Sequence, residues 1–162
     1  MAFDLFVKIS GIEGESTDDK HPGWIEAVTF DTEILQKTSS TASSVGGGSA
    51  ERADFKLLRF SKLVDKASPK LALACAAGMH IDTIVLEICR AGGEKIKYME
   101  YKLSNCLIAR VETAGGPGEF PVDHVSVDFG KIEWSYTVQR RSGGMAAGQI
   151  AGGWNREKNC RV

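Results

Sequence analysis

The sequence lacks a strong excess of either charge, a long apolar run and a charged leader. Its 20 basic and 21 acidic side chains leave a formal net charge of −1 at pH 7. We therefore expect no nucleic-acid partner, because binding to nucleic acid needs a basic face. No apolar run approaches the roughly 18 residues of a membrane helix, so we expect no membrane insertion. Residues 1–6 include an early acid and no basic start, which predicts a cytoplasmic protein without a signal peptide.

Cysteine is sparse and shows no metal-binding spacing. Cys75, Cys89, Cys106 and Cys160 include no Cys-x-x-Cys pair, so the spacing contains neither a zinc nor a redox motif. The first three lie in apolar stretches, where a free cysteine acts as a small hydrophobic residue, whereas Cys160 lies in a polar tail where it could be exposed. We expect no metal ion and no cofactor.

Arrangements that support catalysis are also missing. Only His21, His80 and His124 could act as a general base, and no Gly-x-Ser-x-Gly elbow presents a serine nucleophile. The glycine-rich runs 91–95 and 115–118 lack the spacing of a phosphate-binding loop. We interpret both runs as turns and predict that the chain is not an enzyme but works through its surface.

The polar segment 14–20 carries the acidic pair Asp18-Asp19. It lacks the alternating ligands of a calcium-binding hand, so we interpret it as a solvated turn. His21 is expected in a charged turn before Pro22, and His124 on the polar side of a strand.

Most of the sequence repeats with a period of two, which places alternate side chains on opposite faces of a strand. The apolar rows are Phe3, Leu5, Val7 and Ile9, then Trp24, Val28, Phe30 and Ile34. Further strands are predicted over 54–60, 81–89, 96–111 and 122–138. The paired glycines in 91–94 predict a long hairpin over 81–111.

The last long strand changes the parity of its apolar residues. Val125, Val127 and Phe129 precede Gly130, and Ile132, Trp134, Tyr136 and Val138 follow it on the other parity. A regular strand cannot bury both sets on one side, so we predict a bulge or a sharp bend at Gly130.

One segment is predicted to be helical and two are predicted to be loops. Ser68-Pro69 offers an N-cap and a proline in the first turn, residues 71–77 are good helix formers, and Gly78 offers a stop. The segment 37–50 is rich in Ser and Gly and predicts a protruding loop, which we bound at 37–52. Segment 143–153 has a similar composition and is also interpreted as a loop.

The order of several motifs resembles that of the haemolysin co-regulated protein (Hcp) family of type VI secretion. The similar segments are residues 3–9, 11–16 and 18–21, then 60–62, 65–71 and 78–80, and finally 90–94 and 153–155. They span nearly the whole chain. The departures from the family pattern are in segments 38–50 and 115–121 and in the tail 155–162. In the ring assemblies that the resemblance implies, these are the segments where neighbouring rings would touch.

The resemblance implies a mainly β fold over a single domain, 1–162. That fold is an antiparallel β-barrel of two packed sheets with one short flanking α-helix, like phage tail-tube proteins. It further implies six-membered rings that stack into a tube, which is propelled from the cell inside a contractile sheath behind a spike protein and can carry small effectors in its lumen. Such a protein is cytoplasmic before firing and secreted afterwards.

Two groups of residues are candidates for the assembly. The first is the tip of the long loop, which we expect to grip a neighbour or the next ring: Ser43, Ser44, Val45, Gly46, Gly47, Gly48 and Ser49. The second is the polar face of Thr29, Asp31 and Glu33, which we expect to line the lumen, with an ordinary outer surface as the alternative. A competing function is a secreted β-barrel adaptor that binds effectors without forming tubes.

Overall fold

The computed structural model describes residues 2–38, 50–92, 95–139 and 146–162, so the loop tip 43–49 lies outside the described residues. In this part of the chain no helix is long and apolar enough to span a membrane. The elements are β1 Phe3–Ile9, β2 Ile25–Ala27, β3 Thr29–Asp31, β4 Ile34–Leu35, β5 Asp54–Phe55, β6 Leu58–Leu63, α1 Ser68–Ala77, β7 His80–Arg90, β8 Lys97–Ala114, β9 Val122–Gln139, β10 Ala146–Asn155 and β11 Cys160–Arg161.

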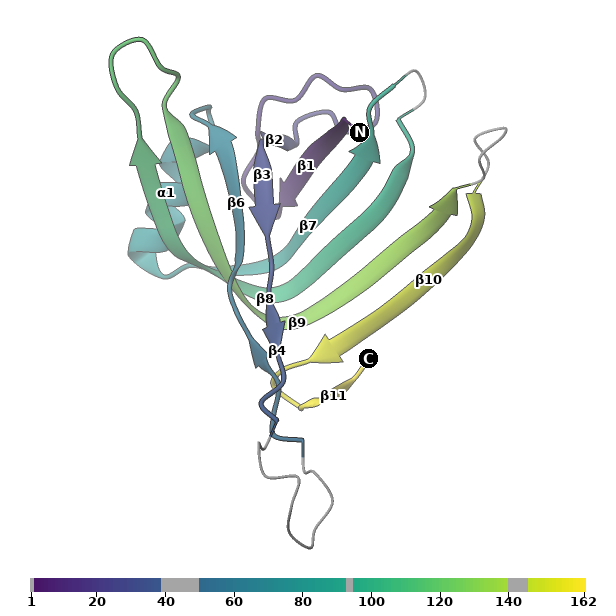
Figure 1. Ribbon diagram of the computed structural model, residues 1–162. Coiled ribbons are helices and arrows are strands. Elements are labelled where there is room, and N and C mark those ends of the chain that lie inside the picture. The colour runs from purple at the N-terminus through teal and green to yellow at the C-terminus, as the bar shows by residue number, and fades with distance from the viewer. Residues whose placement is uncertain (1, 39–49, 93–94, 140–145) are drawn as a thin grey trace, which may run out of the picture.

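A strongly curved antiparallel sheet forms the body of the molecule (Figure 1). Its strands follow the order β11-β10-β9-β8-β7-β1-β2, and β6 pairs with β9 and β3. The long strand β9 pairs with β8 along one edge, and on its other edge its first half pairs with β6 and its second half with β10. The predicted hairpin is confirmed as β7 and β8, with Ile81 opposite Cys106.

The ladders do not close this sheet into a barrel. β2 pairs with β1 and β3 pairs with β6, and no ladder in the described residues joins β2 to β3. The two short strands are consecutive in the chain, separated by Val28, whose N–H donates to the carbonyl of Ser61 (2.7 Å). The predicted antiparallel β fold with one short helix is therefore confirmed, but the expected closed barrel is not, because only this chain connection joins the two ends.

The parity change at Gly130 is a bend shared by two strands. Phe129 and Ile132 are both buried, so the buried face changes parity between them. The register with β8 continues across Gly130, and the nearest register shift lies between Ile108 and Arg110 of β8. β8 changes parity at the same place, since Leu103 and Cys106 are both buried and Asn105 between them has φ +53°. The predicted bend is thus present without a bulge at Gly130.

One predicted loop is a strand. β10 pairs with β9 from Ala146 to Asn155, although its Ala-Gly composition has a low strand propensity. The exposed edge of β9 supplies hydrogen-bonding partners, so the tertiary context overrides local preference. The interpretation of segment 143–153 as a loop was wrong from residue 146 onward.

The helix α1 begins at Ser68 and ends before Gly78, whose φ is +59°. Leu71 and Ala74 are buried against the sheet. Ser68 does not cap the helix as predicted. Its hydroxyl instead donates to Asp123 on β9 (2.5 Å).

A segment before β2 covers the outer face of β1. Leu5, Val7 and Ile9 face the main core, yet Phe6, on the opposite face, is only 2% exposed. Residues 10–24 fold over it, with backbone bonds from Gly14 to Gly23 (2.9 Å) and from Ser16 to Trp24 (3.0 Å). The solvated turn that we expected over 14–20 is therefore partly buried.

Candidate assembly surfaces

Several strands have an edge without a ladder in the part of the chain that the structure describes, and two of them, β10 and β3, are long enough or central enough to matter for assembly. β10 pairs with β9, and β11 covers only Trp154 and Asn155, so the outer edge over 149–152 has no ladder. β3 pairs with β6 alone. An unpaired edge presents N–H and C=O groups that can pair with another chain. The edges of β10 and β3 are therefore two different edges that another chain could pair with.

An apolar patch lies at one end of β6. We call it the Phe120 patch, and it comprises Val28, Leu63, Val64 and Phe120, with Phe120 81% exposed. The four residues line one shallow pocket, together with acidic side chains that include Glu15 and Glu26. A cluster of exposed apolar residues with a polar rim is typical of a protein–protein contact.

The structure brings together two of the three predicted lumen residues. Thr29 and Asp31 lie on the same face of β3, where Thr29 bonds to the hydroxyl of Ser61 (2.6 Å) and Asp31 pairs with Arg59 (2.7 Å). They line a shallow depression whose other residues include Arg110 and His124. This face is polar and carries both acidic and basic side chains.

Glu33, the third predicted residue, is exposed between β3 and β4 and lies outside that depression. Its carbonyl accepts the N–H of Lys56 (3.0 Å). Thr29 and Asp31 are therefore the part of the predicted set that forms one surface.

The long loop leaves the body on a two-stranded stem. β4 and β5 pair through Ile34 with Phe55 and Leu35 with Asp54, and the stem points away from the curved sheet (Figure 1). Lys56 and Asp54 form an ion pair (2.7 Å). This hydrogen bond lowers the pKa of Asp54 and raises that of Lys56. The tip residues 43–49 lie outside the described residues.

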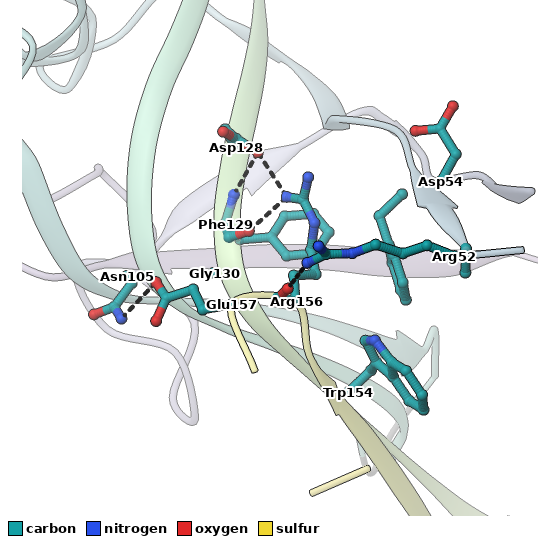
Figure 2. Close-up of a pocket in the computed structure, with 11 residues that line it drawn as sticks. Arg52, Asp54, Asn105, Asp128, Phe129, Gly130, Trp154, Arg156 and Glu157 are labelled. Carbon is teal, nitrogen blue, oxygen red and sulfur yellow. Dashed lines mark hydrogen bonds and ion pairs between the residues drawn. The ribbon is translucent and has the colours of Figure 1, made fainter. Parts of the chain in front are cut away.

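A cleft joins this stem to the corner of the sheet and to the end of the chain. Arg156 donates to Asp128 (2.7 Å) and to the carbonyl of Phe129 (2.5 Å), and its guanidinium lies 4.9 Å from the centroid of the Phe129 ring. Figure 2 shows Arg52, which precedes β5, reaching the carbonyl of Arg156. These contacts connect the stem, the corner of the sheet and the C-terminal turn.

The predicted corner at Gly130 also belongs to this cleft. A Cβ at Gly130 would collide with the carboxylate of Glu157, which accepts a bond from Asn105 (3.2 Å). The backbone of Arg156 bonds to the Gly130 carbonyl (2.8 Å). A side chain at position 130 would therefore displace the Glu157 carboxylate, and the sequence pattern alone did not reveal this contact.

The three histidines occupy three separate places. His80 and His124 are exposed on different strands, as predicted for His124. His21 is buried, with Nδ1 2.8 Å from Asp18 and Nε2 2.8 Å from Glu87. Hydrogen bonds from Lys95 and His21 hold the pKa of Asp18 well below its usual range. Sequence spacing could not reveal this cluster, because Glu87 is 66 positions from His21.

Comparison with known proteins gives consistent relatives over the whole chain. The family model described as "Type VI secretion system effector, Hcp" matches residues 6–136. Protein hcp1 of Pseudomonas aeruginosa is 33% identical over 164 residues, which covers all of both chains. A solved "type six secretion system protein" is 31% identical, with a TM-score of 0.94, and the match covers 99% of this chain and 100% of that chain. Hcp1 from Salmonella typhimurium is 29% identical, with a TM-score of 0.78, over all of both chains.

These matches agree with the motifs and with the fold. The family model and one of the solved structures are both named for a type VI secretion system. The chain belongs to the Hcp family of type VI secretion system proteins.

Proposed function

We propose that this chain is the structural subunit of a type VI secretion inner tube, which forms six-membered rings that stack and is itself secreted. The observation that carries the proposal is the match over the full length to Hcp proteins, with a TM-score of 0.94 to one of the solved structures. The two different unpaired edges and the Phe120 patch support it, because they suit contacts between copies.

Ring closure would join the edge of β10 on one subunit to the edge of β3 on the next. Because the two edges differ, this contact is head-to-tail, and a head-to-tail contact that closes gives a ring. Permanent contacts of this kind bury about 2,000 Å² or more in total. Pairing of the two edges alone buries less area than this, so the Phe120 patch is expected to add buried apolar area.

Sedimentation of the purified protein tests this proposal. The expected species has six times the 17.5 kDa mass of one chain. A single chain at micromolar concentration would refute the ring and favour the adaptor.

Cross-linking tests the choice of edges. Gln149→Cys with Thr29→Cys, in a Cys160→Ser background, should give an oxidised ladder of bands from two to six chains. A matched pair, Gln149→Cys with Ser10→Cys, should give no such ladder, because Ser10 is exposed but belongs to neither edge strand. A ladder that stops at two chains would mean a symmetric contact and would contradict the proposed ring.

Stacking of rings is assigned to the loop tip Ser43–Ser49. Six equivalent contacts of about 1 to 2 kcal/mol each give roughly 6 to 12 kcal/mol before ordering losses, which corresponds to weak to submicromolar adhesion. Such adhesion suits a tube that forms on demand and later falls apart. Deletion of 43–49 should abolish tubes and secretion while rings persist, and unchanged secretion would contradict this assignment.

The lumen wall is assigned to Thr29, Asp31 and Glu33, although Glu33 lies outside the depression that the other two line. A water-filled channel needs a polar wall, and this face carries both acidic and basic side chains. Cysteines placed at these positions should react in free rings but be protected in tubes from reagents too large to enter. Full reactivity in tubes would place the face outside.

The proposed partners are further copies of this chain, the spike protein and contractile sheath of the secretion machine, and small effectors carried in the lumen. In this function the chain is located in the cytoplasm before secretion and leaves the cell when the sheath contracts. Binding of an effector by intact rings, and its loss when Thr29 and Asp31 are changed to bulky residues, tests the carrier role.

A further inference from the structure

Three potential metal ligands meet on the outer face of β7. Glu87 and Cys89 are two residues apart on this strand and so point to the same side, opposite Phe6 and Asp4 of β1. His21 enters from the segment 10–24 and stacks on the Phe6 ring, with centroids 4.0 Å apart and an interplanar angle of 3°. The ring is therefore held in a fixed orientation over the two side chains of β7.

The distances within this cluster fit coordination of one ion. Nε2 of His21 lies 2.8 Å from Oε2 of Glu87 and 3.8 Å from Sγ of Cys89. One ligand atom from each of the three residues lies within 4.8 Å of the others. Two ligands of a tetrahedral zinc ion are separated by roughly 3.3 to 3.6 Å, given metal–ligand bonds of about 2.0 to 2.3 Å. The His21–Cys89 distance is already close to this spacing, whereas closing a separation at the 4.8 Å limit would take a shift of about 1.2 to 1.5 Å.

The surroundings supply the support that a metal ligand needs. Asp18 accepts a hydrogen bond from Nδ1 of His21 (2.8 Å), which leaves Nε2 directed at Glu87 and Cys89. A carboxylate on the other ring nitrogen is the usual partner of a metal-bound histidine. Nζ of Lys97 donates a hydrogen bond to Oε1, the other carboxylate oxygen of Glu87 (3.1 Å). The side chain of His21 is 4% exposed and Cys89 is fully buried.

We propose that His21, Glu87 and Cys89 form a three-ligand site for a soft divalent cation such as zinc, with a fourth position open to a water molecule. One nitrogen, one sulfur and one oxygen ligand match zinc, whereas a thiolate disfavours magnesium and calcium. The neighbouring cations are themselves neutralised, since Lys97 also pairs with Glu100 and Lys95 pairs with Asp4 (3.2 Å) and Asp18.

Titration of the reduced full-length protein with Co²⁺ tests the site. We expect one ion per chain, the thiolate-to-cobalt charge-transfer band in the near ultraviolet, the intense visible bands of tetrahedral cobalt, and displacement by zinc. Cys89→Ser should remove the charge-transfer band, while Cys160→Ser, the matched control at the exposed thiol, should keep it. Asp18→Asn should weaken binding by about 10- to 100-fold and keep the band, as for other partners of a ligating histidine.

Three outcomes would overturn the proposal. The first is a wild-type protein without a charge-transfer band at millimolar Co²⁺. The second is a band lost in Cys160→Ser and kept in Cys89→Ser, which assigns binding to the surface thiol. The third is an unchanged band and affinity in His21→Gln when circular dichroism shows a native fold.

Discussion

A buried ion pair beneath the helix gives the sharpest test of how this fold is stabilised. Lys62 of β6 and Asp123 of β9 are opposite each other in the ladder, and both side chains are fully buried, with Nζ 3.0 Å from Oδ2. Nζ also contacts Asp65 (2.8 Å) and the hydroxyl of Ser68 (3.0 Å), and Thr113 donates to Asp123 (2.6 Å). This network, which we call the Lys62 cluster, joins α1 to three strands.

The change Lys62→Met keeps the length of the side chain and removes its charge. It leaves the carboxylate of Asp123 buried without a cation, and breaking a buried pair on one side costs about 3 to 5 kcal/mol. With a urea dependence of about 2 kcal/mol per molar, the midpoint should fall by roughly 1.5 to 2.5 M. The double change Lys62→Met with Asp123→Asn should cost less than the sum of the two single changes, because no unpaired buried charge remains.

Equilibrium unfolding in urea, followed by tryptophan fluorescence at one fixed protein concentration, measures these values, because association adds to apparent stability. The matched control is Lys56→Met, whose partner Asp54 is 43% exposed, and its midpoint should stay within error. If Lys62→Met lowers stability by less than about 1 kcal/mol, the pair does not act as a desolvated charge pair. Additivity of the two single changes would refute the coupling.

Three further predictions follow from the same geometry. Burial alone would raise the pKa of Asp123, but hydrogen bonds from Ser68, Thr113 and Lys62 outweigh it and lower the pKa, as Lys95 and His21 do for Asp18. Both carboxylates thus stabilise the fold above their unfolded pKa of about 3.9, and this stability should be lost as pH falls below about 4, measured as melting temperature against pH. Gly14→Ala should cost about 1 to 3 kcal/mol, because its Cβ would overlap the backbone of Trp24 and Ile25, whereas Gly116→Ala enters open space and should leave the melting temperature unchanged. In a thiol-titration assay Cys89 and Cys106 should stay slow, because burial raises the pKa of Cys89 to about 11 and that of Cys106 to about 12, whereas Cys160 is exposed and Cys75 is partly exposed; more than two fast thiols would contradict the packing.

Local patterns predicted those elements whose conformation depends on nearby residues. Alternating apolar residues indicated the strands β1, β7, β8 and β9, and the Pro69 and Gly78 signals gave the helix to within a few residues. The exposed Cys160 and the polar side of His124 followed from the same reasoning. These features persist in the fold because side-chain period and turn chemistry act over a few residues.

Predictions failed where a distant segment decides the conformation. The Gly-rich β10 is a strand because the edge of β9 offers partners, and Ser68 bonds to Asp123, 55 positions away, and does not cap its helix. The barrel expected from the family resemblance is not closed by ladders, because β2 and β3 pair with different strands.

The sequence by itself determined the family, the antiparallel β class and most element positions, since motif order and side-chain period are properties of the chain. Only the tertiary structure decided which polar residues are buried together. His21 with Asp18 and Glu87, and Lys62 with Asp123, meet from segments far apart in the chain. Their pairing depends on strand register and on the segment folded over β1, because a buried charge is stable only where the fold brings a partner to it.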